Sequence, residues 1–273
     1  MTLPDQIIRE AVAKSGATAV GISLNDLETG FRWGLNEEDS FHAASTMKVC
    51  VLVELFRQAE SGLLSLSDEV RVENRFASIA DGSTYSVGVE DDSAPELHAL
   101  IGQKSTLINL AIPMITRSSN LATNILVERL GAKQVTATME QLGCHGLNVL
   151  RGVEDGKAYR LGLNNTVCAG GLTKLMTSLA LGTAVSENAS GQMVDILSAQ
   201  EHKKCIPAGV PSGVRCANKT GWNTGICHDT SIVFPPGRQP YILTVLTSGL
   251  NEATDGPELI RAISRCVYES AVS

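Results

Sequence analysis

Ser45 and Lys48 are the first residues whose types and spacing could support catalysis. They open an apolar run, Met47 to Phe56, that only Lys48 and Glu54 interrupt, which predicts a helix buried on nearly all sides. Residues at i and i+3 share a helix face, so the amine and the hydroxyl can meet. Burial would lower the pKa of the Lys48 amine towards that of a usable base, and N–H groups at a helix start favour developing negative charge. The pair therefore indicates a serine nucleophile.

A non-catalytic interpretation of this pair is also open. Ser45 could simply cap the helix, and Lys48 could extend its amine to the surface. With 24 serines and 9 lysines in 273 residues, about one Ser-x-x-Lys is expected by chance. Other parts of the chain must decide between the two interpretations.

A second polar motif, Arg117-Ser118-Ser119-Asn120, lies at a break between two predicted helices. It places a hydroxyl and an amide two residues apart. Ser-x-Asn is weak evidence by itself, because residues 23–25 and 186–188 also match it. The first of these lies in a predicted strand or turn, and the second is typical of a helix cap.

A third motif, Lys219-Thr220-Gly221, ends a predicted strand, and Trp222 begins the link to the next strand. Lys219 could be a solvated edge residue. The apolar neighbours Cys216 and Ala217 instead favour a covered strand.

Composition limits the class of protein. The net charge is -7, the pI is about 5.3 and no basic run is present, which argues against nucleic acid as a partner. Hydrophobic residues make up 43% and charged residues 19% of the chain, as in soluble globular proteins. The length is sufficient for one domain, or for two that share a cleft.

The cysteines and the N-terminus bear on the compartment. Seven cysteines are scattered without a Cys-x-x-Cys pair or zinc spacing, so we expect no metal site and a reducing compartment. Residues 1–10 have neither the basic nor the apolar region of a signal peptide, and no apolar stretch is long enough to span a bilayer. We expect a cytoplasmic protein without membrane contact, or a periplasmic or secreted one if an export segment has been removed.

Hydrophobic periodicity predicts strands first, helices in the middle and strands last. The predicted strands are 17–24, 31–35, 214–219, 226–234 and 241–247. The predicted helices, besides the one that starts at Ser45, are 3–15, 107–115, 121–130, 133–142, 166–181, 187–199 and 257–271.

This order predicts an α/β protein of the α+β type. The two strand groups would form one antiparallel sheet flanked by the N- and C-terminal helices. Residues 1–42 and 206–273 would form this discontinuous sheet domain, and residues 43–205 an inserted helical domain. Segments 71–104 and 144–165 are irregular, and we expect both loops to border a cleft between the domains.

Taken together and in order, Ser-x-x-Lys, Ser-x-Asn and Lys-Thr-Gly resemble the signature of class A β-lactamases and penicillin-binding proteins. The resemblance extends over nearly the whole chain. It implies a β-lactamase/transpeptidase-like fold with the active site between its two domains. It also implies a serine hydrolase, most simply a β-lactamase, that acts on a small-molecule β-lactam or acyl-D-Ala-like substrate without metal or cofactor.

The resemblance implies a role for each motif residue. Ser45 would be the acylated nucleophile and Lys48 its proton acceptor or relay. Ser118 would pass a proton to the departing lactam nitrogen. The remaining roles concern binding. Asn120 would hold the substrate amide, and Lys219 and Thr220 would hold the substrate carboxylate. Gly221 would let the strand approach the ligand, and the N–H groups of Ser45 and Trp222 would form the oxyanion hole.

Glu154, 36 residues after Ser118, matches the Glu that activates the deacylating water in the class A family. The resemblance is incomplete here, because Ala158 stands where the family has Asn. Asn164 or Asn165 could fill that gap, and an alternative is that Glu154 pairs with Lys157 or Arg151. Two further departures are Ser119, where the family commonly has Asp, and the 73 residues that separate Ser45 from Ser118.

Three functions compete on these grounds. A monomeric β-lactamase is the leading hypothesis. The absence of a recognisable signal peptide and the altered Glu154 loop favour a D,D-peptidase or an esterase of the same fold. A penicillin-binding receptor that stays acylated is the third. Tyr85 is a candidate wall residue of the cleft, whereas His42 and His228 are more typical of structural histidines.

Overall fold

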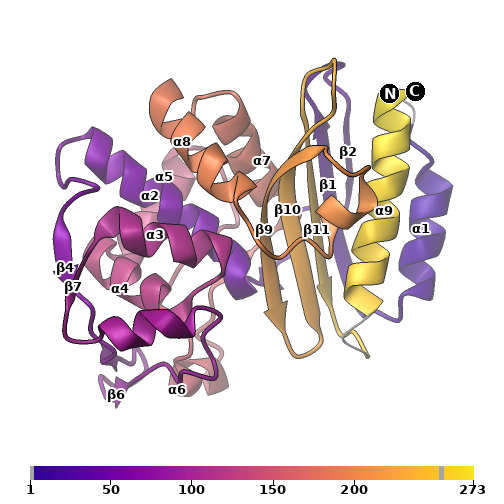
Figure 1. The fold of residues 1–273 in the computed structure, drawn as a ribbon. Helices are drawn as coiled ribbons and strands as arrows, with labels where there is room; N and C mark the ends of the chain where they lie inside the picture. The colour runs from indigo at the N-terminus through magenta and orange to yellow at the C-terminus, as the bar shows by residue number, and fades with distance from the viewer. Residues whose placement is uncertain (1–2, 252–254) are drawn as a thin grey trace.

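The computed structural model describes residues 3–251 and 255–273. The central strands are β1 (Ala19–Asp26), β2 (Arg32–Leu35), β9 (Arg215–Asn223), β10 (Ile226–Phe234) and β11 (Tyr241–Ser248). They form one antiparallel sheet in the order β2-β1-β11-β10-β9 (Figure 1). β1 pairs with β11, with Ile22 opposite Val245, so the first and last strand groups share this sheet as predicted.

Helices cover both faces of the sheet (Figure 1). α1 (Asp5–Lys14) and α9 (Asp255–Val272) lie on one face, and α7 (Ala169–Ala180) and α8 (Glu187–Ser198) lie on the other. Most residues of β10 and β11 are therefore buried, whichever face their side chains occupy. The predicted antiparallel sheet flanked by the N- and C-terminal helices is confirmed, with both helices on the same face (Figure 1).

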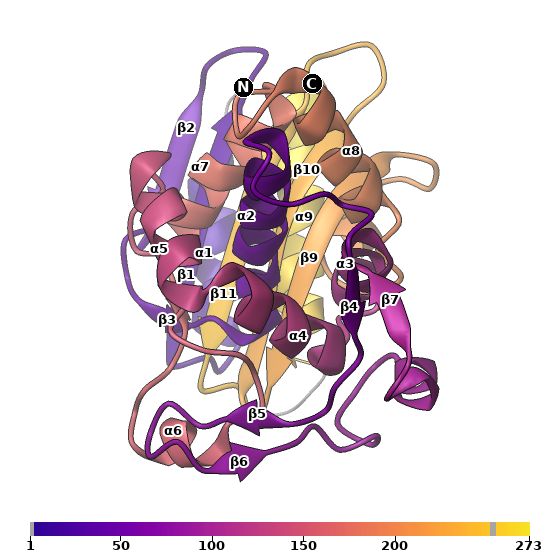
Figure 2. The ribbon, with the colours of Figure 1, turned by 90° about the vertical axis from the view of Figure 1, so that its left-hand side faces the viewer.

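The inserted helices surround α2 (Lys48–Glu60), which is buried from Lys48 through Phe56 (Figure 2). Its neighbours are α3 (Leu107–Thr116), α4 (Asn120–Leu130) and α5 (Ala132–Gln141). Glu54 is tolerated inside because its carboxylate accepts hydrogen bonds from Arg57 at 2.7 Å and from Thr138 at 2.6 Å. The predicted all-round burial of this helix is confirmed.

Two of the boundaries that differ from the prediction are explained by strand pairing. Thr166–Val167 forms β8, which pairs with β3 (Phe41–His42), so the helix predicted from residue 166 starts only at Ala169. β9 continues through the Lys-Thr-Gly motif to Asn223 instead of ending at residue 219. Pairing with the distant strand β3 sets the first boundary, and pairing with the hairpin partner β10 sets the second. Local periodicity does not report either pairing.

The two segments predicted to be irregular contain short elements. Within 71–104, β5 (Phe76–Ala77) pairs with β6 (Thr84–Tyr85), and η2 (Pro95–Leu100) follows. β4 (Glu69–Arg71) and β7 (Lys104–Thr106) pair at the ends of this segment. The later segment contains α6 (Gly156–Arg160).

We propose that residues 1–42 with 206–273 and residues 43–205 are the two domains. A single hydrophobic cluster joins them, since it contains Leu52 of α2 as well as Ile232 and Ile242 of the sheet. Across the described ranges, 3–251 and 255–273, no helix has both the length and the apolarity needed to cross a membrane.

Candidate active site

Ser45 lies in η1 (Ala44–Met47), a 3₁₀ turn that leads directly into α2. Ala44, just before it, has a φ of 43°, in the left-handed region that non-glycine residues rarely adopt. Ser118 (64°) and Glu154 (62°) share this conformation, and Asn36 is the remaining non-glycine example in the described chain. Such strained residues concentrate at functional sites, and three of them meet here.

Lys48 is completely buried, so it does not extend to the surface. Its Nζ donates to the Ser118 carbonyl at 2.7 Å, to Asn120 Oδ1 at 2.8 Å and to Ser118 Oγ at 3.2 Å. Burial, assisted by the positive charge of Lys219, holds the pKa of Lys48 well below its usual range, although Asp92 and Glu154 oppose the shift. An amine in this state can accept a proton near neutral pH.

Ser118 lies between the two buried lysines. Lys219 Nζ donates to Ser118 Oγ at 3.0 Å from the side opposite the first motif, and also to its neighbour Thr220 O at 2.9 Å. Burial lowers the pKa of Lys219 to about 7, against the opposing charge of Asp229. Because both amines donate to this hydroxyl, its lone pairs are occupied and its own proton is left to donate elsewhere.

Gly221 brings β9 against the nucleophile turn. A Cβ at this position would lie 3.1 Å from the Ala44 Cβ and 3.2 Å from the Ser45 backbone nitrogen. Both distances are shorter than ordinary van der Waals contact, so any Cβ at this position would push the strand and the turn apart by a few tenths of an ångström. Trp222 follows directly, and its side chain is 43% exposed at the mouth of the cleft.

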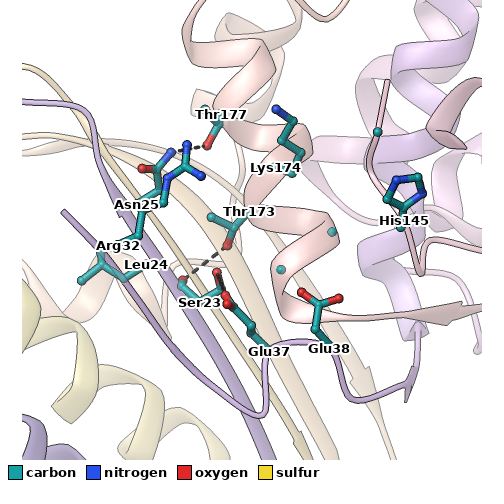
Figure 3. A pocket seen from close by; sticks show the side chains of 13 residues that line it. Ser23, Leu24, Asn25, Arg32, Glu37, Glu38, His145, Thr173, Lys174 and Thr177 are labelled. Atoms are coloured by element: carbon teal, nitrogen blue, oxygen red, sulfur yellow. Dashed lines mark hydrogen bonds between the residues drawn. The ribbon is translucent and has the colours of Figure 1, made fainter. Parts of the chain in front are cut away.

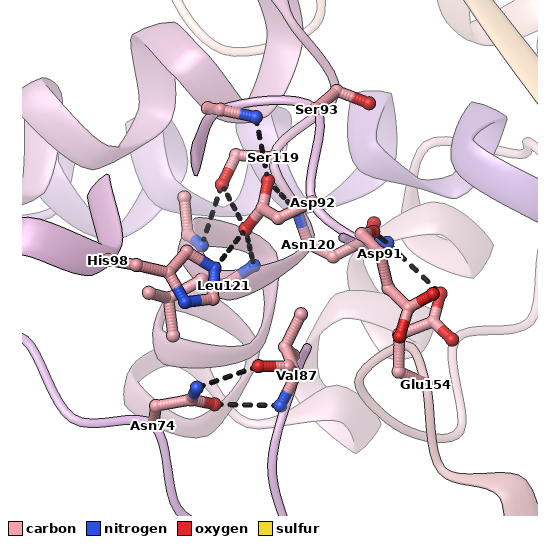
Figure 4. Close-up of polar contacts among 12 residues, drawn as sticks. Asn74, Val87, Asp91, Asp92, Ser93, His98, Ser119, Asn120, Leu121 and Glu154 are labelled. Carbon is pink, nitrogen blue, oxygen red and sulfur yellow. Dashed lines mark hydrogen bonds and ion pairs between the residues drawn. The ribbon is translucent and has the colours of Figure 1, made fainter. Parts of the chain in front are cut away.

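Glu154 contacts Asn120 rather than the asparagines considered from the sequence. Asn120 Nδ2 donates to Glu154 Oε1 at 3.0 Å (Figure 4). Burial, followed by the charge of Asp91, raises the pKa of Glu154, while Lys48 and Arg151 act in the opposite direction. A raised carboxyl pKa suits a general base that works near neutral pH.

The other groups suggested as neighbours of Glu154 are bound elsewhere. Arg151 Nη2 donates to Asn164 Oδ1 at 3.0 Å, and Asn165 Oδ1 accepts from the Arg151 backbone N–H at 3.1 Å. Lys157 pairs with Asp81 at 2.9 Å. Ala158, at the family's Asn position, is buried.

Side chains that sequence reasoning missed hold the Glu154 loop in place. Asn124 on α4 pairs twice with Val153, accepting from its N–H at 2.6 Å and donating to its carbonyl at 3.0 Å. Asp155 accepts from Ser78 Oγ at 2.9 Å and from the Ile79 N–H at 3.1 Å, which ties this loop to the β5–β6 hairpin. The only signal in the sequence was polar residues within irregular segments.

These residues border a cleft of about 410 Å³, whose lining includes Ser45, Asn120, Glu154 and Trp222. His42 also lines it, with Nδ1 accepting from the Ala44 N–H at 3.1 Å. The expectation that Tyr85 forms a wall is wrong. Its ring packs on Phe76 at 5.7 Å, and it lines a different cavity.

His228 is structural, as its position on a strand suggested. It is completely buried, its Nε2 lies 2.9 Å from the His42 carbonyl and its Nδ1 accepts from the Thr247 N–H at 3.1 Å. Burial lowers its pKa to about 4. It therefore supports the backbone next to the cleft as a neutral side chain.

The two other Ser-x-Asn triplets serve structure. Ser186 caps α8 by accepting from the Ala189 N–H at 3.2 Å. Ser23 and Asn25 line a separate cavity of about 270 Å³ between β1 and α7 (Figure 3). There Asn25 donates to Thr177 at 3.0 Å, so its amide already has a partner. Of the three triplets, only the one at Ser118 contacts Lys48 and Lys219.

A buried lysine next to a serine turn, a second serine between two amines and a glycine-containing edge strand are the parts expected of a serine acyl-transfer site, and they occur here in an α+β fold. The chain belongs to the β-lactamase enzyme family, whose model matches residues 3–271. The resemblance inferred from the three motifs is confirmed.

Individual relatives are distant but span the chain. β-Lactamase CARB-4 of Pseudomonas aeruginosa is 23% identical over 265 residues, covering 95% of this chain and 88% of the relative. An ancestral class A β-lactamase structure is 26% identical with a TM-score of 0.81, covering 98% and 100% of the two chains. The structure of PBP-A, at 24% identity and a TM-score of 0.83, covers 98% of both and shares the fold.

Proposed function

We propose that this protein is a class A β-lactamase that opens the β-lactam amide through an acyl-enzyme on Ser45. Membership of the β-lactamase family supports the reaction class. The main observation behind the assignment of residues is the buried hydrogen-bond network that runs from Lys48 through Ser118 to Lys219.

Acylation would use this network. Lys48 would take the proton from Ser45 Oγ as the oxygen attacks the lactam carbonyl. The proton would pass from Lys48 to Ser118 as Ser118 gives its own to the departing nitrogen, so no net charge is left on the enzyme. The 3.2 Å between Lys48 Nζ and Ser118 Oγ supports this relay.

Binding would use β9 and the turn after α3. Lys219 and Thr220 would hold the substrate carboxylate, and Asn120 would hold the side-chain amide. The backbone N–H groups of Ser45 and Trp222 would bind the oxyanion, which the close approach at Gly221 supports.

Deacylation would depend on Glu154. Its carboxylate would take a proton from a water molecule that attacks the acyl carbonyl, and Ser45 Oγ would leave and recover a proton. The contact between Glu154 and Asn120 supports this role, since it links the base to the residue that also binds Lys48.

A chromogenic cephalosporin followed by absorbance and intact mass tests the proposal. Sustained turnover that Ser45→Ala abolishes is the expected result. A single burst with a persistent mass adduct would favour a receptor that stays acylated. No colour and no adduct, with activity on simple esters or D-Ala-D-Ala peptides, would refute the lactamase assignment.

We further propose a monomer that uses a small-molecule substrate and no nucleic acid, in keeping with the net charge of -7. Seven scattered cysteines support a reducing compartment such as the cytoplasm. Light scattering and cell fractionation test these two points.

A further inference from the structure

Segment 87–98 of the first long loop lies against the turn that contains the Ser-x-Asn motif (Figure 4). It is fastened at one end by Asn74, whose side chain exchanges two hydrogen bonds of 2.8 Å with the Val87 backbone. Asp92 projects inward from this segment and is only 6% exposed. A carboxylate buried to this extent needs strong partners.

Most partners of Asp92 are the groups that begin α4, and its Oδ1 also accepts from the Ala94 N–H of its own segment at 3.0 Å. Its Oδ2 accepts from Ser119 Oγ at 3.1 Å and from the Leu121 N–H at 2.8 Å. Its Oδ1 accepts from the Asn120 N–H at 3.2 Å. His98 Nε2, 3.3 Å from Oδ2, covers the carboxylate from the loop's own side.

These contacts satisfy N–H groups at the start of α4 that the Ser119 side chain does not reach. Ser119 Oγ accepts from the N–H of Ala122 at 3.2 Å, and Asp92 accepts from the two N–H groups that precede it. A negative charge also interacts favourably with the N-terminus of a helix. The carboxylate thus stabilises a turn in which Ser118 keeps its left-handed backbone.

The turn fixed in this way sets the direction of the Asn120 side chain. Its Nδ2 donates to the carbonyl of Asp91 at 2.8 Å and to Glu154, while its Oδ1 accepts from Lys48. A shift of this turn would therefore displace the partners of both the acylation and the deacylation base.

We propose that Asp92 is a positioning residue for the reaction: from the 71–104 loop it supplies the carboxylate that holds Ser118 and Asn120 in their working geometry. The inference rests on the proposed function. It also explains why position 119 is Ser where the family commonly has Asp. The carboxylate is supplied by Asp92, on another segment of the chain, 3.1 Å from the Ser119 hydroxyl.

Exchange of the two side chains tests this assignment. Asp92→Ser alone removes the acceptor of three N–H groups, those of Asn120, Leu121 and Ala94, and should lower kcat/KM about 10- to 100-fold, chiefly through kcat. Ser119→Asp alone places two carboxylates together in a buried site and should also lower activity. The double variant restores one carboxylate opposite one hydroxyl and should recover to within about tenfold of the wild type.

Glu90→Gln, an exposed change in the same loop, is the matched control and should keep wild-type kinetics. All rates are measured per active site, counted by adduct mass, well below each melting temperature. A purely structural Asp92 would lower the melting temperature and the active fraction while kcat per site stayed unchanged. If Asp92→Ser does not fold, Asp92→Asn, which keeps the shape and loses the charge, replaces it in the same comparison.

Two results would overturn the inference: an Asp92 variant with wild-type kcat and KM, or an exchange variant no better than the worse single one. If the wild type turns over no β-lactam, the proposed function fails separately. The rate at which a fluorophosphonate forms an adduct with Ser45 then decides the inference, and equal rates in wild type and the Asp92 variant would refute it.

Discussion

Glu154→Gln is the change that bears most directly on release of the acyl group. The amide has the same shape as the carboxyl and keeps an oxygen to accept the 3.0 Å hydrogen bond from Asn120. What it loses is the negative charge and the ability to take a proton from water. The substitution therefore isolates general-base chemistry from packing.

The size of the effect follows from the role. A positioned general base contributes about 10²- to 10⁴-fold, so steady-state kcat should fall by this factor, equivalent to about 3–5 kcal/mol in the deacylation barrier. Lys48 also loses a neighbour that raises its pKa, so its amine becomes neutral at lower pH. Acylation should therefore persist, and a covalent adduct should accumulate on Ser45.

The assay combines stopped-flow absorbance with intact mass at intervals of seconds to hours. Glu90→Gln serves as the exposed control, and Ser45→Ala should show no adduct. In the wild type, kcat should rise with pH through the pKa of Glu154, which burial places above the usual 4.5, because only the carboxylate form accepts a proton. Turnover in Glu154→Gln within about threefold of the wild type, without adduct, would refute the assignment of the base.

Three further outcomes are expected. Lys219→Ala removes one charged donor from Ser118 and the proposed partner of the substrate carboxylate, so kcat/KM should fall about 10- to 100-fold; an unchanged value for an anionic β-lactam would contradict this. Gly221→Ala forces a Cβ to 3.2 Å from the Ser45 nitrogen, so kcat should fall with little change in melting temperature, and a normal kcat would show that the strand can move. His228 should titrate near pH 4 in histidine NMR spectra. In the unfolded chain its pKa returns to about 6.5, so its neutral form stabilises the folded state fully above pH 6.5. This contribution, about 3 kcal/mol in total, is lost as the pH falls from 6.5 towards 4. A shift change near pH 6.5 would contradict its burial.

Local patterns were sufficient for much of the fold. Apolar periodicity predicted the terminal helices, the buried helix after Ser45 and the strands of the sheet, because each reports which face of one element is covered. The errors occur where a partner outside the predicted element decides the conformation. Thr166 leaves its helical pattern to pair with β3, and Tyr85 turns to Phe76 instead of the cleft.

The motif residues Ser45, Lys48 and Lys219 were predictable because their spacing fixes their chemistry. The residues that hold these side chains in position could not be predicted. Asp92 lies in the segment 71–104, for which the sequence predicted only irregular structure, and the contact between Asn120 and Glu154 joins residues 34 positions apart. Hydrogen bonds between irregular loops leave no periodic trace in a sequence, so only the structure reveals which polar residue meets which.

The tie between Asp155 and the β5–β6 hairpin has a consequence for variation in this protein. The loop that carries Glu154 is joined to the hairpin tip through Ser78 and, at the surface, through Lys157 and Asp81. If Glu154 is the proposed deacylation base, changes at the exposed tip would alter the lifetime of the acyl-enzyme without contacting the substrate. Laboratory evolution for faster or slower acyl release could therefore target the hairpin tip, which is far from the nucleophile in sequence and open to solvent.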